Sequence, residues 1–231
     1  MRDIVSVGFE KYIENNPLFS GCESVDVLRV LKGAQKIVLK RKQIIFHVGD
    51  IPTGFYILLS GQVKLAFLSS QGAEKVVDVI REGESFCEAL MFLEQPYVAF
   101  AEAIQDCDLL HISKSVILEK IERNKALAFR IMGGMATRTY EILSDIEGYS
   151  FLTGLQRTIK FLLQELPEAY DSSSALLVKL PFDKRIVASK LNLTQEHFSR
   201  ILWELSSDGL IDIDRKFIYI PNIERLIDYL V

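Results

Sequence analysis

The chain has 231 residues, of which 49% are hydrophobic and 25% charged, and its formal net charge at pH 7 is −4. This composition supports a packed core and excludes global disorder. Charges interrupt the apolar residues of the first 17 positions, and no apolar run approaches the roughly 18 to 20 residues that span a bilayer. We therefore expect a cytoplasmic protein without a signal peptide or a membrane partner.

Residues 35–112 have the pattern of short β-strands. Gly49, Gly61, Gly72 and Gly83 recur every 11 or 12 residues and separate runs that are rich in β-branched and aromatic side chains. Glycine adopts a positive φ without steric cost, so it suits the ends of strands. This spacing predicts an antiparallel barrel or roll, although a β-sandwich fits it about as well.

The stretch from residue 114 to residue 147 has helical periodicity. No proline lies between positions 115 and 146, and a set of residues alternates steps of four and three, as a coiled-coil seam does. We expect this seam to pair two copies of the chain; it consists of Ala128, Met132, Met135, Thr139, Ile142 and Ile146. Leu127, Ile131 and Leu143 lie beside the seam and could pack on the roll. A helix buried within one domain is the alternative interpretation.

Two shorter helices are expected near the C-terminal end, after a helical pattern at 155–166 and an exposed loop at 167–175. Asp183 is a suitable N-cap for the first of the two, and Asn192 ends it. Thr194 caps the second helix, which turns four apolar residues inward, namely Phe198, Ile201, Leu202 and Leu205. A hairpin formed by 210–213 and 217–220 follows. A helix, a tight turn and a second helix with a polar first turn are the parts that major-groove insertion needs.

The outward residues of the second helix suit base recognition. Arginine can bond to guanine O6 and N7, glutamate can accept from cytosine N4, and serine is permissive. The predicted DNA contacts are Thr194, Gln195, Glu196, His197, Ser199 and Arg200. Residues 148–231 are nearly neutral overall, so phosphate binding would depend on local basic patches. The alternative is an ordinary helical pair with a solvated charged face.

Three motifs resemble the CRP/FNR superfamily of bacterial regulators: FHVGD at 46–50, FYILLSGQVK at 55–64 and LTQEHFSRIL at 193–202. The resemblance runs from about Pro17 to the C-terminus. It implies an α+β fold in three parts: N-terminal helices and an antiparallel, jelly-roll-like β-roll sensor domain at 1–113, a long dimerisation helix at 114–147, and a winged helix-turn-helix domain at 148–231. It also implies a homodimer that binds double-stranded DNA and regulates transcription.

Within this superfamily, Glu196, Ser199 and Arg200 resemble the E-x-x-S-R pattern of the FNR branch. That pattern implies palindromic half-sites of the TTGAT type. His197 stands where many members carry threonine or a small residue. The loop at 167–175 lies where family members contact RNA polymerase, which makes the polymerase an expected partner, although a surface loop is by default a connection.

The resemblance also bears on the effector. The cyclic-nucleotide branch holds a phosphate with a glycine–glutamate pair and a later arginine, whereas here Cys87 precedes Glu88 and no arginine occurs between Arg81 and Arg123. An unpaired buried phosphate is costly, so we do not expect cyclic AMP. Cys22 is the one cysteine near the N-terminus, so an iron–sulfur cluster is not expected either.

The segment FCEALMFLEQPYVAFAEA, at 86–103, resembles the DNR type of regulator, which responds to nitric oxide and is associated with haem. Haem is therefore a possible cofactor, with His47 or His111 as a candidate ligand and with no other metal site expected. A histidine that stands alone in a sequence is more often structural than a ligand. The predicted effector pocket consists of Phe86, Glu88, Leu90, Met91, Tyr97, Leu127 and Ile131.

Two other classes of function were compared with a DNA-binding regulator. An enzyme is not expected, because the chain has no nucleophile elbow, zinc-protease motif or phosphate-binding loop. A cyclic-nucleotide-binding-like effector module that acts through protein partners is the second alternative. The outward set Glu196, Ser199 and Arg200 favours DNA over a protein partner.

Overall fold

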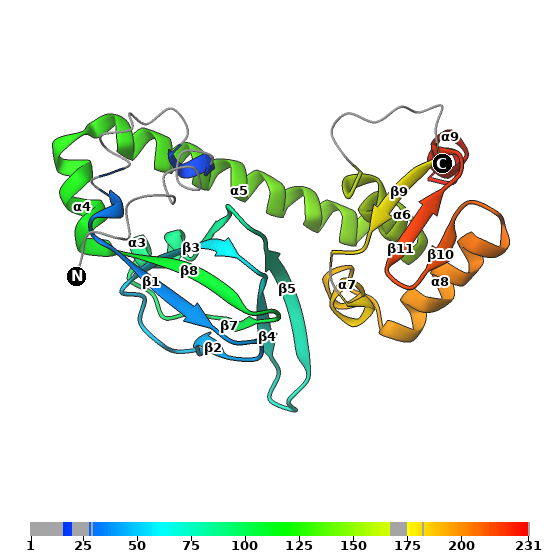
Figure 1. The fold of residues 1–231 in the computed structure, drawn as a ribbon, viewed down its shortest axis with the longest axis horizontal. Helices are drawn as coiled ribbons and strands as arrows, with labels where there is room; N and C mark the ends of the chain where they lie inside the picture. The colour runs from blue at the N-terminus through cyan, green and yellow to red at the C-terminus, as the bar shows by residue number, and fades with distance from the viewer. Residues whose placement is uncertain (1–15, 20–27, 29, 167–174, 182, 231) are drawn as a thin grey trace. The chain divides into compact units, whose positions relative to one another are not determined.

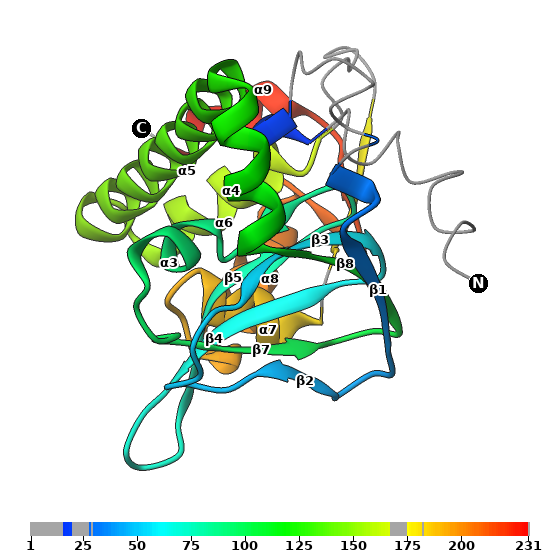
Figure 2. The same ribbon diagram turned by 90° about the vertical axis from the view of Figure 1, so that its left-hand side faces the viewer.

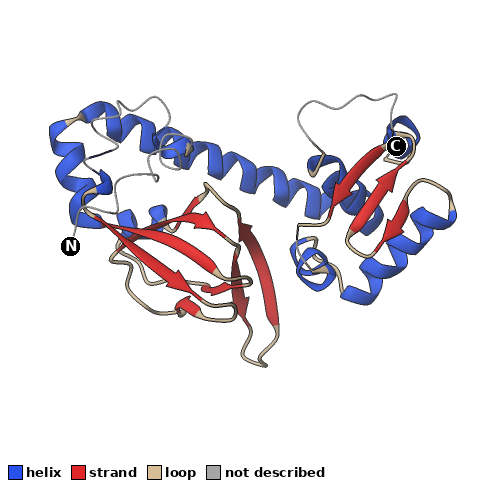
Figure 3. Ribbon diagram, in the orientation of Figure 1, coloured by secondary structure: helices blue, strands red, loops and turns tan. Residues whose placement is uncertain are grey.

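The computed structural model describes residues 16–19, 28, 30–166, 175–181 and 183–230. Figure 1 shows the ribbon coloured along the chain, and Figure 3 shows it coloured by secondary structure. The chain divides into two compact units, residues 1–141 and 142–231. Helix α5, Lys125–Phe151, contributes residues to both units. Among the described residues, no helix is both long and apolar enough to cross a membrane.

The first unit contains two four-stranded antiparallel sheets, with strand orders β1-β8-β3-β6 and β2-β7-β4-β5. In Figure 2, β1, β3 and β8 lie above β2, β4 and β7. The strands are β1 (Ala34–Leu39), β2 (Ile44–Phe46), β3 (Gly54–Ser60), β4 (Val63–Leu68), β5 (Glu74–Ile80), β6 (Ser85–Phe86), β7 (Phe100–Ala103) and β8 (Cys107–Ser113). The predicted antiparallel roll is confirmed, and the four regularly spaced glycines all have positive φ.

Strand β3 is buried on both faces, and this explains its continuous apolar sequence. Side chains alternate between the two faces of a strand. Tyr56 and Leu58 point into a cluster that also contains residues of β4 and β7, so this cluster lies between the sheets. Ile57 and Leu59 point into a second cluster on the other face, where Leu127 and Ile131 of α5 cover the sheet. The first unit therefore has two cores, one on each side of β3 and β8.

The predicted single helix over 114–147 is two helices in the structure. Helix α4, Lys114–Arg123, ends at Asn124, whose backbone is extended with φ −139°. The Asn124 side-chain oxygen then accepts a hydrogen bond from the Ala126 amide at 3.0 Å, which caps the start of α5. The local preference of asparagine for a helix cap explains the break.

A short helical turn, η1 (Pro17–Phe19), lies against the middle of α5. A Cβ atom on Gly134 would lie 2.7 Å from Leu18 Cδ2, so Leu18 occupies the space that a larger residue would need. Asn16 is fully buried, and its side-chain amide donates to the Gly83 carbonyl at 2.8 Å. The turn is thus attached to the roll and packed against α5 at Gly134.

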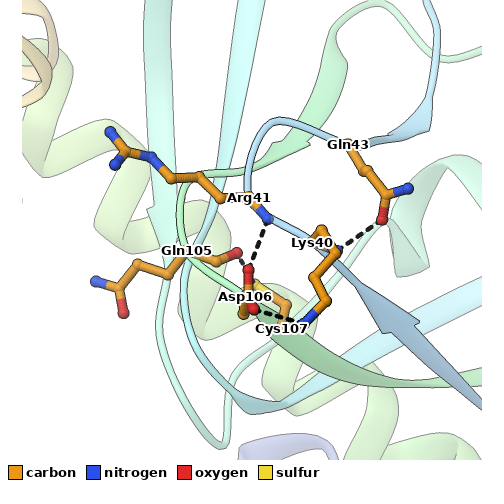
Figure 4. Close-up of polar contacts among 6 residues, drawn as sticks. All are labelled: Lys40, Arg41, Gln43, Gln105, Asp106 and Cys107. Carbon is orange, nitrogen blue, oxygen red and sulfur yellow. Dashed lines mark hydrogen bonds and ion pairs between the residues drawn. The ribbon is translucent and has the colours of Figure 1, made fainter.

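Two connections of the roll are joined by one carboxylate. Asp106, in the turn between β7 and β8, accepts hydrogen bonds from the Arg41 amide at 3.0 Å and from Lys40 Nζ at 2.8 Å (Figure 4). The Gln43 side chain accepts from the Lys40 amide in the same turn. These bonds lower the pKa of the exposed Asp106 carboxyl, the largest effect being the hydrogen bond from Lys40.

The second unit combines helices with a three-stranded antiparallel sheet of order β10-β11-β9. Its elements are α6 (Gly154–Gln164), β9 (Leu176–Lys179), α7 (Lys184–Lys190), α8 (Gln195–Ser207), β10 (Asp212–Asp214), β11 (Phe217–Ile220) and α9 (Ile223–Asp228). The two expected short helices and the hairpin are present. Strand β9 was not predicted; it pairs with β11, about 40 residues further along the chain.

Candidate nucleic-acid interface

A four-residue turn sets the angle between α7 and α8. Asn192 adopts the left-handed conformation, with φ 57°, which asparagine tolerates better than most residues. The Leu193 amide donates back to the Ala188 carbonyl at 2.9 Å. Thr194 then caps α8, and its hydroxyl accepts from the His197 amide at 3.1 Å, as predicted. Asp183 stands at the N-cap position of α7, but its side chain makes no capping hydrogen bond.

Helix α8 has one fully buried face and one exposed face. The four residues predicted to point inward are at most 3% exposed. Glu196, Ser199 and Arg200 are all exposed, as are Thr194 and Gln195. Burial of Glu196 and Arg200 would have removed the basis for the predicted DNA contact, and the structure leaves both side chains accessible.

His197 differs from the other residues of the predicted contact set. It is half-buried, and its ring carbon Cε1 would lie 3.4 Å from a Cβ atom placed on Gly154. Leu193 Cδ2 would lie 2.9 Å from the same Cβ, so α6 and α8 approach closely at Gly154. The imidazole therefore packs toward α6.

Arg157 of α6 forms hydrogen bonds with the backbone next to the turn between α7 and α8. Its Nε donates to the Leu191 carbonyl at 2.9 Å, and its Nη1 donates to the Leu152 carbonyl at 2.8 Å. Leu191 is the residue at which α7 ends. Hydrogen bonds from a charged donor are stronger than those between neutral groups, so Arg157 fixes α6 against the end of α7. No motif in the sequence marks Arg157 as part of this site.

The β10–β11 hairpin places two cations at its tip. Arg215 has φ 56° and is exposed together with Lys216. The Lys216 carbonyl accepts from the Leu180 amide at 2.7 Å, which holds the hairpin to the end of β9. The tip is therefore anchored while its cationic side chains stay accessible, and this suits a phosphate contact.

The six residues of the predicted dimer seam all lie on α5. Met132, Ile142 and Ile146 are between 51% and 53% exposed, and Thr139 is also exposed. Ala128 is half-buried, and Met135 packs partly against the core that also contains Leu127 and Ile131. Leu143, which was expected beside the seam, is 59% exposed.

The structure divides the predicted effector pocket between the two cores of the roll. Phe86 and Tyr97 belong to the cluster between the sheets, and Leu90 packs against it. Met91, Leu127 and Ile131 belong to the cluster under α5. Helix α3, Glu88–Leu93, lies between the clusters, so the successive residues Leu90 and Met91 point to different sides.

An aromatic stack occupies the cluster between the sheets. The Phe46 and Tyr97 rings are stacked with centroids 3.6 Å apart, and Tyr56 stacks on Phe86 at 5.2 Å. The His111 ring packs on Tyr56 at 5.0 Å, and its Nε2 lies 3.3 Å from the Thr53 hydroxyl. Burial lowers the pKa of His111. His47 is exposed, so the two candidate haem ligands differ in environment.

Cys87 and Glu88 begin α3. Cys87 has φ 74°, a conformation that favours glycine, at the position where the cyclic-nucleotide branch is expected to carry glycine. Burial raises the pKa of the Glu88 carboxyl, and a hydrogen bond with Ser85 opposes this shift. In the described part of the chain, no group of three or more His, Cys, Asp or Glu side chains could hold a metal ion.

Comparison with known families assigns both units. Residues 36–124 match the cyclic nucleotide-binding domain, and residues 156–229 match the Crp-like helix-turn-helix domain. The chain belongs to the CRP/FNR family of transcription regulators. It is therefore a DNA-binding regulator and not an enzyme, as the sequence predicted, and the family acts through dimers.

Family members with named roles are similar over most of the chain. The anaerobic regulatory protein of Bacillus subtilis is 24% identical over 88% of this chain and 87% of its own length. The cyclic AMP receptor protein of Thermus thermophilus is 25% identical over 86% of this chain and 89% of its own. The crystal structure of DNR from Pseudomonas aeruginosa covers 96% of this chain and 97% of its own, with 29% identity and a TM-score of 0.53.

These CRP/FNR relatives explain why the α8 motif was informative, since a helix-turn-helix of this kind is a shared feature of the family. Of the loop at 167–175 that was expected to contact RNA polymerase, residues 167–174 lie outside the described residues, as does Cys22. The N-terminal helices expected in the domain 1–113 are described only in part, because residues 1–15, 20–27 and 29 lie outside the described residues.

Proposed function

We propose that the chain acts as a homodimeric regulator that reads a TTGAT-like palindrome through Glu196, Ser199 and Arg200. The observation that carries this proposal is the exposure of these three side chains on α8 beside a fully buried opposite face. Arg200 would bond to guanine, Glu196 would accept from cytosine N4, and Ser199 would support either contact. Gln195, Thr194 and the tip residues Arg215 and Lys216 would hold the phosphates.

In this proposal, each predicted domain has its own role. Residues 1–113 would sense the effector, residues 114–147 would join the two copies, and residues 148–231 would bind DNA. The exposed seam residues Met132, Ile142 and Ile146 support a contact with a second copy, because apolar side chains on one face of a helix are stabilised by a partner. RNA polymerase is the further partner proposed, and the cytoplasm is the proposed location.

A binding measurement tests the proposal directly. A fluorescent duplex with the palindrome should raise its anisotropy on addition of the chain, and a duplex whose half-site guanines are replaced by adenines should bind at least tenfold more weakly. Half-site spacing should matter, because a symmetric dimer needs two sites about one helical turn apart. Equal affinity for both duplexes would refute base reading and leave the protein-partner alternative.

The proposed effector is not cyclic AMP. Two observations support this: the missing arginine between 81 and 123, and the aromatic stack of Phe46, Tyr97, Tyr56 and Phe86 between the sheets. Calorimetric titration of the chain with cyclic AMP tests the point, since micromolar binding would refute it.

A haem-linked response to nitric oxide is the finer proposal, and it is supported by the likeness to DNR. The arrangement around the histidines fits haem poorly, because His111 packs on Tyr56 and His47 is exposed. Absorbance spectra of haem-reconstituted protein, with and without nitric oxide, test whether haem binds and responds to nitric oxide. No shift of the Soret band would reject the proposal.

A further inference from the structure

Helix α8 carries one large side chain that the base-reading set leaves unexplained. Trp203 is the single tryptophan of the sequence, and 71% of its side chain is exposed. Tryptophan is highly buried on average, because its large apolar ring is costly to leave in water. Its exposure on this helix indicates a surface that a binding partner covers.

Trp203 lies on the same face of α8 as the proposed base-reading residues Glu196, Ser199 and Arg200, and we call this the DNA-reading face. It follows Arg200 by three residues, Ser199 by four and Glu196 by seven. At 100° per residue, these spacings put its Cα within about 60° of all three around the helix axis. The buried residues Phe198 and Leu205 lie on the other side. Trp203 is therefore near the centre of the exposed face, about 10 Å behind Glu196 along the axis.

We propose that Trp203 contacts the sugar–phosphate backbone of the bound DNA. The N-terminal residues of a recognition helix contact the bases. A residue on the same face about 10 Å further along the helix therefore lies beyond the base-reading turn, where it can reach the sugar–phosphate backbone that borders the groove. The indole offers an apolar face that can pack on deoxyribose and an Nε1–H that can donate to a phosphate oxygen. The inference rests on the proposed function.

The chemistry around Trp203 agrees with a phosphate neighbour. Indole has one donor, no acceptor and no charge, so it does not repel a phosphate as a carboxylate would. Glu204 is also exposed, but it follows Trp203 directly and so points about 100° away. Arg200, one turn earlier, adds a positive charge on the same face.

Tryptophan emission tests the contact without any label on the protein. The full chain is titrated with the palindromic duplex, and anisotropy of a fluorescein on the DNA reports binding independently. We expect the emission to change and iodide quenching to fall severalfold, with the same midpoint as the anisotropy. Binding with unchanged emission and quenching overturns the inference and leaves the proposed function intact; no binding to any duplex overturns both.

Substitution at Trp203 identifies the kind of contact. Trp203→Ala should weaken binding about tenfold to the palindrome and to a scrambled duplex alike, because backbone contacts carry no sequence information. Trp203→Phe keeps an apolar ring without the N–H donor and should fall between. Phe67→Ala, which removes an exposed aromatic side chain from β4, is the matched control and should have no effect.

Three outcomes of these experiments overturn the inference. If Trp203→Ala binds the palindrome as tightly as the unmodified chain, or loses affinity for the palindrome alone, Trp203 does not contact the backbone. If the emission shifts with protein concentration in the absence of DNA, the indole contacts a second copy instead. Circular dichroism checks that each variant is folded. We expect each variant to fold, because the side chains of Trp203 and Phe67 are exposed.

Discussion

Arg157 Nε donates a hydrogen bond to the Leu191 carbonyl across 2.9 Å, which joins α6 to the C-cap residue of α7. The same guanidinium holds the Leu152 carbonyl. Two carbonyls that lie 39 positions apart in the sequence thus share one cation, and one of them opens the turn that leads into α8.

Replacing Arg157 should loosen this support. Arg157→Met leaves both carbonyls without their donor and should lower the free energy of unfolding by about 1–3 kcal/mol. Arg157→Lys keeps the charge but not the planar guanidinium that donates to both carbonyls, so it should recover part of the lost free energy of unfolding. Urea denaturation measures the change. Arg225→Met, an exposed arginine of α9, is the control, and an equal effect there would contradict the supporting role.

Arg200→Ala should reduce discrimination rather than stability. A bidentate contact with guanine contributes about 1–3 kcal/mol of discrimination, so the difference between the palindrome and a duplex altered at one guanine should shrink by that amount. Anisotropy titrations with both duplexes measure it. Arg225→Ala removes the same charge from α9 and should leave discrimination unchanged. If Arg200→Ala weakens binding equally on all sequences, Arg200 contacts phosphate.

Thr194→Ala should destabilise α8 at its start. The Thr194 hydroxyl accepts from the His197 amide, and loss of such a cap costs about 1 kcal/mol. Thr194→Ser retains the hydroxyl and should behave as the unmodified chain. Thermal unfolding followed by circular dichroism compares the two variants; similar midpoints for alanine and serine would show that the cap contributes nothing.

Glu88 should make the stability of the roll depend on pH. Burial raises its pKa above the ordinary value of 4.5, so the folded chain holds this proton more tightly than the unfolded chain does. Its contribution to stability is therefore fully present below pH 4.5, falls as the pH rises through the folded-state pKa, and then levels off. Glu88→Gln should remove this fall and be the more stable protein at pH 7, as urea denaturation across pH 4.5–8 would measure.

Glu94 provides a control of opposite sign for this pH dependence. A hydrogen bond and the charge of Lys114 lower the pKa of this exposed carboxyl. Its contribution is therefore present above pH 4.5 and is lost as the pH falls through its folded-state pKa. Glu94→Gln should not become more stable at pH 7. A pH profile of Glu88→Gln that matches the unmodified chain would refute the assignment to Glu88.

Ile142→Glu should weaken the proposed pairing through α5. The Ile142 side chain is 51% exposed, and a carboxylate at this position would face its own symmetry mate. Sedimentation equilibrium should show a dimer dissociation constant at least tenfold higher. Val38→Glu adds the same charge at an exposed apolar site of β1 and should leave the dimer unchanged.

Helix α8 was predictable because its sequence is amphipathic, its cap is a threonine and its two faces differ sharply. The break at Asn124 was not, because apolar residues with helical spacing flank it on both sides. Strand β9 has four residues and gains its hydrogen bonds from β11, so nothing local identified it. The sequence did not show that the predicted effector-pocket residues divide between two cores, because neighbours in sequence can enter different cores, as Leu90 and Met91 do.

Leu18 packs against Gly134, so the N-terminal turn η1 contributes to the packing around α5. A truncation that begins after Phe19 would remove Leu18 and leave apolar atoms of α5 open to water, while a larger residue at position 134 would push the turn away. Changes at either end of this contact would therefore alter the same helix that carries the proposed pairing surface, although neither Leu18 nor Gly134 belongs to a strand or to the DNA-binding helix α8.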